Sequence, residues 1–553
     1  MKSALSWLTN FERKTTAMLL VAGFAMVTAL AGTFTLAPLD RDEARFAQAT
    51  VQMLESGDFV RIRFQDAERN KKPAGIHWLQ AASVSVFSDV QARAIWAYRI
   101  PSMAGIVAAA IFTFLAGARL YDVKTGMLAG MFLASAPLVA AEATIAKTDG
   151  VLLALICLAQ LAFLHVYGAV REGRNPSRRA SAGFWIAQGA GMLMKGPIAP
   201  MVSLLTGLGL TSTAPRLSWI ASLRPVVGIL IFMLMVLPWG AAIWSATDGR
   251  FFTESVGGDM LGKLGEAQEG HVGPPGYHAF LVWALFWPAS ALIAPGIIAA
   301  WRDRADWRAL FLLSWLIPAW LLFEATATKL PHYVMPLYPA LAILAARAAT
   351  GSAPPFWAHK LGAAVYAGVG FLAAALIVIP SLALNNTLPG LFLLAAAAGI
   401  AALTILIATL FWRGQGYAGG LAAAVLSCTF AWVIMTGVLP GLSQLAISPR
   451  LSAMLELKGQ HPLRDGVQPV ALVGYSEPSA VFLLGTQTSL TTAEAAATQL
   501  RDGAISAAII EAEATDRFLN TLQGTAVASL AEIDGLNYSN GKPVALQVYV
   551  LAP

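Results

Sequence analysis

Two adjacent carboxylates, Asp42 and Glu43, lie in the segment LDRDEARFAQATVQMLESGDFV, directly after the first strongly apolar stretch of the chain. Charged side chains next to a membrane-spanning segment are costly and usually serve a function. A carboxylate within hydrogen-bond reach of a hydroxyl can accept its proton while the oxygen attacks an electrophilic carbon. The pair is therefore the first candidate for catalytic chemistry.

Cations follow the carboxylates in the same segment. They are Arg61, Arg63, Arg69, Lys71 and Lys72, the last directly before Pro73. Arginine and lysine bind phosphate through charge-assisted hydrogen bonds. The cluster therefore predicts an anionic ligand such as a lipid phosphate, with a solvated loop of surface cations as the alternative.

Other polar residues stand at the edges of later apolar stretches. They are Asp149 in AKTDGVLL, Lys195 in GMLMKGP, and Lys329, His332 and Tyr333 in KLPHYVMPLYP. His271 and His278 lie in EGHVGPPGYHAF, where their spacing exceeds the i, i+4 step of a helical metal pair. We interpret that stretch as a gating or acceptor-binding loop rather than a metal site. For His77 and His165 we expect structural roles.

The rest of the chain must hold these residues in a membrane. Of its 553 residues, 57% are hydrophobic and only 12% are charged, which excludes an ordinary soluble domain. We attribute the net charge of +6 to basic cytoplasmic loops and not to nucleic-acid binding. Both cysteines, Cys157 and Cys428, lie in apolar runs, so we predict neither a disulfide framework nor a cysteine metal site.

Apolar stretches long enough to cross a bilayer as helices recur up to residue 440. The first is longer than a signal-peptide core and lacks a clear cleavage site, so we expect it to be retained as a span. About 13 transmembrane helices are predicted. They cover residues 17–36, 97–118, 126–141, 148–168, 182–195, 198–214, 225–245, 279–300, 309–324, 333–350, 361–381, 387–411 and 417–440.

The basic residues predict the orientation of these spans. A cytoplasmic N-terminus leaves every basic loop inside, including the Arg-rich loop 171–179. The segments 37–96, 246–278 and 325–332, and everything after residue 440, then face outward. Within the first outer loop, ARFAQATVQMLESGDF, which stops at Gly57, and PAGIHWLQAASVSVF predict two amphipathic helices at the membrane interface.

The composition changes near residue 441. The stretches PVALVGYS, SAVFLLG, AISAAIIEA and VALQVYVLAP predict short strands, and TAEAAATQLRDG predicts a helix that ends at glycine. We therefore expect two domains. Residues 1–440 form a transmembrane catalytic domain that includes both outer loops, and residues 441–553 form a small α/β domain outside the membrane that packs on those loops.

The joint order of several motifs resembles the aminoarabinose transferase branch of the GT-C glycosyltransferases, which is related to the protein O-mannosyltransferases. These motifs are D-R-D-E-A-R-F-A with SGDF downstream, K-K-P-A-G-I-H-W-L, the aspartate of AKTDGVLL, MKGP and K-L-P-H-Y-V-M-P-L-Y-P. The resemblance covers residues 10–350 and, more loosely, YSEPSAVFLLG in the tail. Lys71 stands where the family often has an acidic residue, and Phe46 stands where it has a tyrosine. The sugar could therefore be a uronic acid, a hexose or an amino sugar.

The resemblance implies a polytopic α-helical enzyme of the bacterial inner membrane that acts at the periplasmic face. Such an enzyme transfers a sugar from an undecaprenyl-phosphate donor to lipid A or another envelope lipid or glycan. The family's catalytic carboxylate maps onto Asp42, its phosphate-contacting lysine onto Lys72, and a second acidic residue onto Asp149. We cast Asp42 as the general base, with Glu43 and Arg45 positioning it, although Glu43 could share the proton because adjacent carboxylates can couple. The predicted phosphate-binding set is Lys72, Lys71, Arg45, Arg69 and Lys195, and the predicted donor and acceptor pocket is Lys329, His332, Tyr333 and His271.

The expected reaction inverts the anomeric centre and requires no metal or other cofactor, because lysine and arginine can stabilise the leaving phosphate. We expect a monomer. Three alternatives stay open: a protein O-glycosyltransferase of the same fold, a transporter or flippase of lipid-linked sugars, and a non-catalytic scaffold. A transporter would need ionisable residues deep within the spans and often shows paired repeats, whereas the acidic residues here gather at one predicted face.

Overall fold

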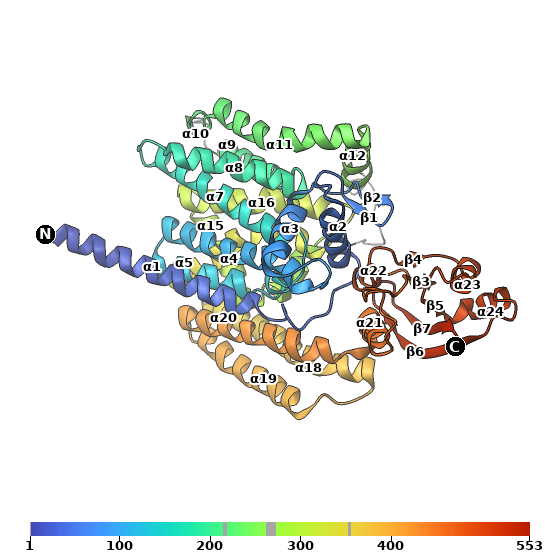
Figure 1. Ribbon diagram of the computed structural model, residues 1–553. Helices are drawn as coiled ribbons and strands as arrows, with labels where there is room; N and C mark the ends of the chain where they lie inside the picture. Colours follow the sequence, from blue (N-terminus) through green and yellow to red (C-terminus); the bar gives the residue numbers. More distant parts are fainter. Residues whose placement is uncertain (1, 214–217, 262–272, 352–355, 553) are drawn as a thin grey trace.

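The computed structural model describes residues 2–213, 218–261, 273–351 and 356–552. It is a bundle of long helices with a small mixed sheet at one end (Figure 1). Helix α1 (Lys2–Ala29) begins at the opposite end of the bundle. A polytopic helical protein with a small C-terminal sheet domain is therefore confirmed as the fold class.

Every predicted span overlaps a helix or a bent pair of helices. After α1 these are α4 (Ile95–Leu120), α5 (Val123–Ser135) with α6 (Pro137–Ala143), α7 (Asp149–Arg171), α8 (Arg178–Lys195), α9 (Ile198–Thr213), α11 (Pro225–Thr247), α14 (Tyr277–Leu285) with α15 (Ser290–Arg302), α16 (Trp307–Ala325), α17 (Tyr338–Thr350), α18 (Phe356–Asn385), α19 (Leu391–Trp412) and α20 (Gly416–Trp432). Among the described residues, eight helices are long and apolar enough to cross a membrane, or ten if each bent pair is one span. The number of 13 stays a prediction.

Two of the spans are broken at proline. The α5–α6 pair bends by 65° at Pro137, and the second pair bends by 88° at Phe286, directly before the short turn Trp287–Ala289 that contains Pro288 and leads into α15. Proline lacks the backbone N–H that would continue the hydrogen-bond ladder, and its ring clashes with the preceding turn. The first bend matters for the site because it leads the chain into the segment before Asp149.

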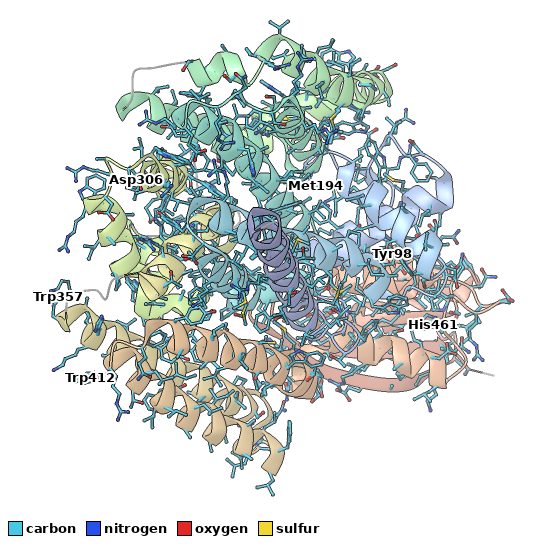
Figure 2. The ribbon with its side chains drawn as sticks, turned by 90° about the vertical axis from the view of Figure 1, so that its left-hand side faces the viewer. Tyr98, Met194, Asp306, Trp357, Trp412 and His461 are labelled. Atoms are coloured by element: carbon cyan, nitrogen blue, oxygen red, sulfur yellow. The ribbon has the colours of Figure 1, made fainter. Side chains whose placement is uncertain are left out.

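Helix α7 is the central helix of the bundle. In its most apolar stretch 78% of the residues are buried, compared with 17% in α11 and 22% in α19, which are exposed as helices facing lipid would be. Figure 2 shows Trp357 and Trp412 at the rim of the bundle, at the ends of the similarly exposed α18 and α19. Glycine lets α7 pack tightly on α4, because a Cβ at Gly105 would lie 2.5 Å from the carbonyl oxygen of Gly150.

The first outer loop folds as predicted in part. It contains α2 (Asp42–Ser56), the strand pair β1 (Arg63–Phe64) and β2 (Ala67–Glu68), and α3 (Gly75–Phe87). Gly57 ends α2 in the left-handed conformation, with φ of 70°, as the sequence predicts. The apolar stripe of α2 does not face lipid, and the place of the helix at the membrane interface stays a prediction. Its apolar residues Ala44, Ala47 and Val51 are buried against α3, α4 and the C-terminal domain, so protein and not lipid covers the stripe.

The C-terminal region forms a five-stranded sheet in the order β4-β3-β5-β7-β6. Its strands are β3 (Val470–Val473), β4 (Ser489–Leu490), β5 (Ala507–Glu511), β6 (Val527–Asn537) and β7 (Lys542–Leu551), with helices α21 (Ile447–Leu457), α22 (Pro478–Leu484), α23 (Ala493–Arg501) and α24 (Thr515–Thr521). The pairs of β3 with β4 and β5 are parallel, and β7 runs antiparallel to β5 and β6. SAVFLLG, predicted as a strand, is helix α22, because Pro478 starts a helical turn that Gly485 ends.

Candidate active site

Glu43 is buried and links the start of the loop 37–96 to helix α4. It forms a two-pronged ion pair with Arg99 of α4, in which Nε and Nη2 each lie 2.8 Å from a carboxylate oxygen, and both side chains are fully buried. The main-chain N–H groups of Leu39 and Ala146 also donate to this carboxylate at 2.8 Å. Four donors occupy the two oxygens of Glu43. These contacts hold the carboxylate in place, and its role in positioning Asp42 stays a prediction.

Asp42 begins helix α2 directly beside this buried pair. Its side chain is 59% exposed, and one of its oxygens lies 3.9 Å from a guanidinium nitrogen of Arg69. Arg69 in turn lies over the ring of Phe46, 4.6 Å from its centre. The hydrogen bond from Ala146 to Glu43 places Asp42 next to the segment that leads into α7. Asp42 is thus an accessible carboxylate at the junction of segments 40–43 and 142–149.

A cluster of buried ions lies on the other side of that junction. Asp149, the first residue of α7, accepts a hydrogen bond from Lys195 of α8 at 2.6 Å and faces Lys147 at 3.6 Å. Lys147 also contacts Glu142 of α6 at 2.9 Å, and His332 lies 3.9 Å from the same glutamate. Asp149, Lys195 and His332, which the sequence predicts as site residues, are therefore brought together by two residues that it did not single out.

The neighbouring carboxylates keep Lys147 ionised. Burial opposes the charged form of Lys147, but Glu142 and Asp149 outweigh it and raise the pKa of the lysine above its usual value. The charge of Asp42, across the junction, also raises the pKa of Lys147. One oxygen of Glu142 is buried without a protein partner. The cluster thus offers both cations and one open acceptor to a ligand.

The predicted phosphate lysines lie in the turn before α3. Lys71 is exposed and Lys72 is half-buried. Gly75 lets this turn approach α8, because a Cβ there would lie 2.6 Å from the carbonyl oxygen of Leu193, two residues before Lys195. Arg45 is half-buried on α2, where its charge acts on Asp40. The structure therefore gathers Lys72, Arg69 and Lys195 around the same junction as Asp42 and Asp149.

The remaining pocket residues divide into three cases. Lys329 is buried, and its ammonium group donates to the carbonyl oxygens of Gly273 and Thr326 at 3.2 and 3.1 Å, so it fastens the end of the second outer loop. Tyr333 packs against the rings of His332 and Phe323. His271 lies outside the described residues.

His278 has a structural environment. Its two ring nitrogens contact Glu324 at 3.2 Å and the carbonyl oxygen of Leu330 at 3.1 Å, and the ring is fully buried. In the parts of the chain that the structure describes, no group of three His, Cys, Asp or Glu side chains is placed to hold a metal ion.

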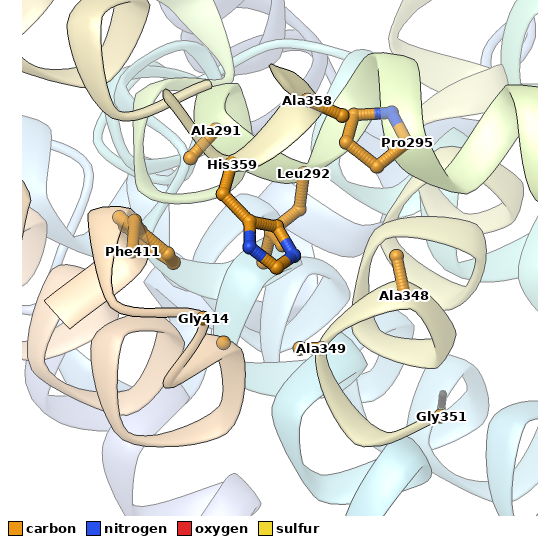
Figure 3. A pocket seen from close by; sticks show the side chains of 11 residues that line it. Ala291, Leu292, Pro295, Ala348, Ala349, Gly351, Ala358, His359, Phe411 and Gly414 are labelled. Carbon is orange, nitrogen blue, oxygen red and sulfur yellow. The ribbon is translucent and has the colours of Figure 1, made fainter. Parts of the chain in front are cut away.

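A cavity of about 60 Å³ lies elsewhere and does not belong to this site. It is lined by residues of α15, α17, α18 and α19, with His359 pointing into it (Figure 3). Among its lining residues are Ala348 and Ala349, near the C-terminal end of α17. The segment of His332 and Tyr333 precedes the N-terminal end of the same helix, and at 1.5 Å per residue the two ends are about 20 Å apart.

Asp40, two residues before Asp42, supplies a testable pH dependence. Burial raises its pKa from 3.8 to about 6, with Glu477 acting in the same direction and the hydrogen bonds to Ser479 and the charge of Arg45 opposing it. Because the folded protein binds this proton more tightly, the stabilising contribution is complete below about pH 4 and is lost as the pH rises through 6. We expect Asp40→Asn to flatten the melting temperature against pH between pH 4 and 7. A pH dependence equal to that of the parent would contradict this assignment.

The helical bundle with its C-terminal sheet domain has the fold of solved membrane transferases. The crystal structure of ArnT from Cupriavidus metallidurans bound to undecaprenyl phosphate superposes with a TM-score of 0.74 at 19% identity, over 96% of this chain and 97% of that one. An oligosaccharyltransferase from Archaeoglobus fulgidus superposes with a TM-score of 0.52 at 12% identity, over 99% and 75% of the two chains.

In sequence, the chain is similar to aminoarabinose transferases. It is 27% identical over 349 residues to the undecaprenyl phosphate-alpha-4-amino-4-deoxy-L-arabinose arabinosyl transferase of Pseudomonas aeruginosa, and 27% identical over 314 residues to that of Yersinia pestis. The first match covers 60% of this chain and 59% of the length of that relative. Residues 71–244 match the family described as dolichyl-phosphate-mannose-protein mannosyltransferase. The resemblance predicted from the motifs is confirmed.

Proposed function

We propose that this chain is a membrane glycosyltransferase that moves a sugar from an undecaprenyl-phosphate carrier to lipid A or another envelope lipid or glycan at the periplasmic face. The observation that carries the proposal is the junction of segments 40–43 and 142–149. It combines an accessible carboxylate, Asp42, with the buried cation Lys147 and the half-buried cation Lys195. The similarity to arabinosyl transferases supports the same class of reaction.

In the proposed reaction an acceptor hydroxyl attacks C1 of the sugar while Asp42 accepts its proton. The bond between C1 and the phosphate oxygen breaks, and the carrier leaves as a phosphate anion with the bonding electrons. Lys72 and Arg69 stabilise this anion, and Lys195 and Lys147 supply further positive charge. Attack from the side opposite the leaving group inverts the anomeric centre. Glu43 does not exchange the proton in this scheme, because its oxygens already accept four hydrogen bonds.

The direction of the site across the membrane is part of the proposal. The sheet domain, α2 and α3 lie at one end of the bundle and α1 begins at the other (Figure 1). With the N-terminus in the cytoplasm, as the basic loops indicate, the candidate site faces the periplasm. Lipid-linked donors and envelope acceptors meet at that face.

A protein acceptor is the second candidate. The match of residues 71–244 to a family described as protein mannosyltransferases favours it. Both candidates share the donor chemistry and differ only in the hydroxyl that attacks. A flippase of lipid-linked sugars would move the donor without breaking its glycosidic bond.

One assay separates these functions. The purified protein in detergent is mixed with an undecaprenyl-phosphate donor carrying a labelled sugar and either lipid A or envelope protein as the acceptor. Label in the lipid fraction supports the proposal, and label in protein supports the second candidate. No transfer to any acceptor, with movement of intact donor across reconstituted vesicles, would overturn the enzymatic proposal. Mass spectrometry of envelope lipids with and without the protein then identifies the sugar and acceptor.

Lys72→Ala is expected to weaken binding of undecaprenyl phosphate about 10-fold to 100-fold, because a hydrogen bond to a charged group contributes about 1.5–3 kcal/mol. Lys71→Ala should have a smaller effect, since its side chain is exposed. The matched control is Lys360→Ala, which removes a lysine that lies over Trp412 on α19, away from the junction. Titration calorimetry in detergent measures the three affinities. A Lys72→Ala protein that binds within twofold of the parent would remove Lys72 from the phosphate site.

A further inference from the structure

We infer that the C-terminal domain positions Asp42. Its contacts hold the segment 37–41 and helix α2 in place. The inference rests on the proposed function, which makes Asp42 the group whose position matters. It adds a role in positioning Asp42 to the packing on the outer loops that the sequence predicts. Three sets of contacts carry it.

The first contacts fasten the residues directly before α2. One oxygen of Asp40 accepts a hydrogen bond from the main-chain N–H of Ser479 at 2.9 Å, and the N–H of Asp40 donates to the hydroxyl of Tyr538 at 2.5 Å. Ser479 is the second residue of α22, and its hydroxyl donates to Ser448 at 2.6 Å inside the domain. The C-terminal domain therefore binds both the side chain and the main chain of Asp40, which lies two residues before Asp42.

The partners of Asp40 are themselves held by the domain. Tyr538 lies in the turn between β6 and β7, next to Asn537. The amide of Asn537 donates to Glu477 at 2.8 Å, and the hydroxyl of Ser539 donates to the other oxygen of Glu477 at 3.2 Å. The turn and the start of α22 thus form one surface that receives Asp40.

The second set of contacts runs along α2. Gln48 donates to the hydroxyl of Thr486 at 2.8 Å, and that hydroxyl donates to Glu55 at 2.8 Å. Gln65, in the turn between β1 and β2, donates to the carbonyl oxygen of Thr488 at 2.5 Å. These bonds span α2 from its second turn to its last. The domain therefore fixes the rotation of the helix as well as its start.

The third set of contacts is apolar. Phe482 of α22 is fully buried in one cluster with Ala44, Ala47 and Val51 of α2. Its ring meets Tyr98 of α4 edge to face, with ring centres 5.5 Å apart. The C-terminal domain therefore completes the core that holds α2 against the bundle.

The start of α2 needs such support. Arg41, the residue before the first helical position, has φ of 64° and ψ of −95°, and no side chain caps the helix there. A non-glycine residue in this conformation is strained and persists only when its surroundings enforce it. The strained residue lies between the anchored Asp40 and the proposed base Asp42. Releasing Asp40 should let Arg41 relax and move the Asp42 carboxylate.

The test replaces single side chains on either side of the contact between Asp40 and the C-terminal domain. Tyr538→Phe removes one hydroxyl oxygen, and Asp40→Ala removes the carboxylate that receives Ser479. We expect each to lower kcat for sugar transfer by tenfold or more with KM within about twofold of the parent, because a small displacement of a catalytic group costs rate and not substrate affinity. Asp40→Asn keeps an oxygen acceptor and should restore most of the rate lost in Asp40→Ala.

The matched control is Tyr549→Phe, the same substitution within β7 of the same domain, where the hydroxyl contacts Gln547 and not α2. It should transfer sugar at the parental rate. Hydrogen–deuterium exchange supplies an independent readout, with faster exchange of residues 37–47 in Asp40→Ala and Tyr538→Phe and no change there in Tyr549→Phe.

Two outcomes are distinguishable. Parental kcat and parental exchange in both Asp40→Ala and Tyr538→Phe, in a preparation whose parent transfers sugar, would overturn the positioning role alone. A parent that transfers no sugar would instead overturn the proposed function on which the role rests.

Discussion

Asp42→Asn is expected to lower kcat for sugar transfer by about 10² to 10⁴, the range that a positioned general base contributes. Asparagine has nearly the same shape and keeps an oxygen that can face Arg69, so the start of α2 should stay folded. What it lacks is the capacity to accept the proton of the attacking hydroxyl. The loss should therefore appear in kcat, while the affinity for undecaprenyl phosphate stays close to that of the parent.

Asp66→Asn is the control for this substitution. Asp66 is an exposed carboxylate in the turn between β1 and β2 of the same outer loop. It should transfer sugar at the parental rate, which would separate proton acceptance from a general change in loop charge. Initial rates with a labelled donor at saturating acceptor measure both variants. If Asp42→Asn retained full transfer, another group would be the base, and Asp149 or Glu142 would be the next to replace.

The helices of the bundle could be predicted because a membrane imposes one strong constraint on the sequence. Each span must be apolar for about 20 residues, and such runs are visible in the sequence. Proline explains one departure from these predictions. Pro137 breaks the span 126–141 into two helices at 65°. Hydropathy alone cannot give that angle, because it depends on how the freed backbone groups are satisfied.

The candidate site was predicted less completely because ion pairs join residues far apart in the chain. Asp149, Lys195 and His332 were recognised by motif, but their partners Lys147 and Glu142 were not. A signal for them exists in AEATIAKTDG, where a glutamate and a lysine interrupt apolar sequence beside the recognised aspartate. Arg99 gives a similar signal near the start of the span that follows the outer loop. Nothing local in the sequence pairs it with Glu43.

In the C-terminal region one element was predicted with the wrong secondary structure. SAVFLLG has the composition of a buried strand, yet it forms helix α22 and supplies Phe482 to the core around α2. A short apolar run does not distinguish a strand from a buried helix by periodicity. The domain packs on the loop 37–96, but its contacts could not be predicted, because those of Ser479 and Tyr538 with Asp40 join residues more than 400 positions apart.

Arg99→Met is expected to destabilise the protein by about 3–5 kcal/mol, because it leaves Glu43 as a buried charge without its counterion. The guanidinium also donates to the carbonyl oxygens of Thr33, Leu36 and Ala37, so three main-chain acceptors lose their donor at once. These acceptors lie between α1 and Asp42. The loss should therefore lower the melting temperature and loosen the segment that carries the proposed base.

The matched control for this prediction is Arg119→Met. Arg119 makes an ion pair of similar length, 2.7 Å, with Glu172, but both side chains are partly exposed, at 22% and 27%. Such a pair contributes about 0–1 kcal/mol, so the same substitution should shift the melting temperature only slightly. Scanning fluorimetry in detergent compares the two variants. Equal shifts would mean that the Glu43–Arg99 pair is no more than an ordinary surface contact.

The double variant Glu43→Leu with Arg99→Met separates the effect of the ion pair on stability from its effect on sugar transfer. Removing both charges eliminates the unpaired carboxylate, so part of the stability should return. It should not return in full, because the N–H groups of Leu39 and Ala146 then lose their acceptor as well. A double variant that is as stable as the parent but transfers sugar slowly would show that the pair serves mainly to place Asp42 beside the ion cluster. Full stability together with full transfer would show that the outer loop holds its shape without the pair.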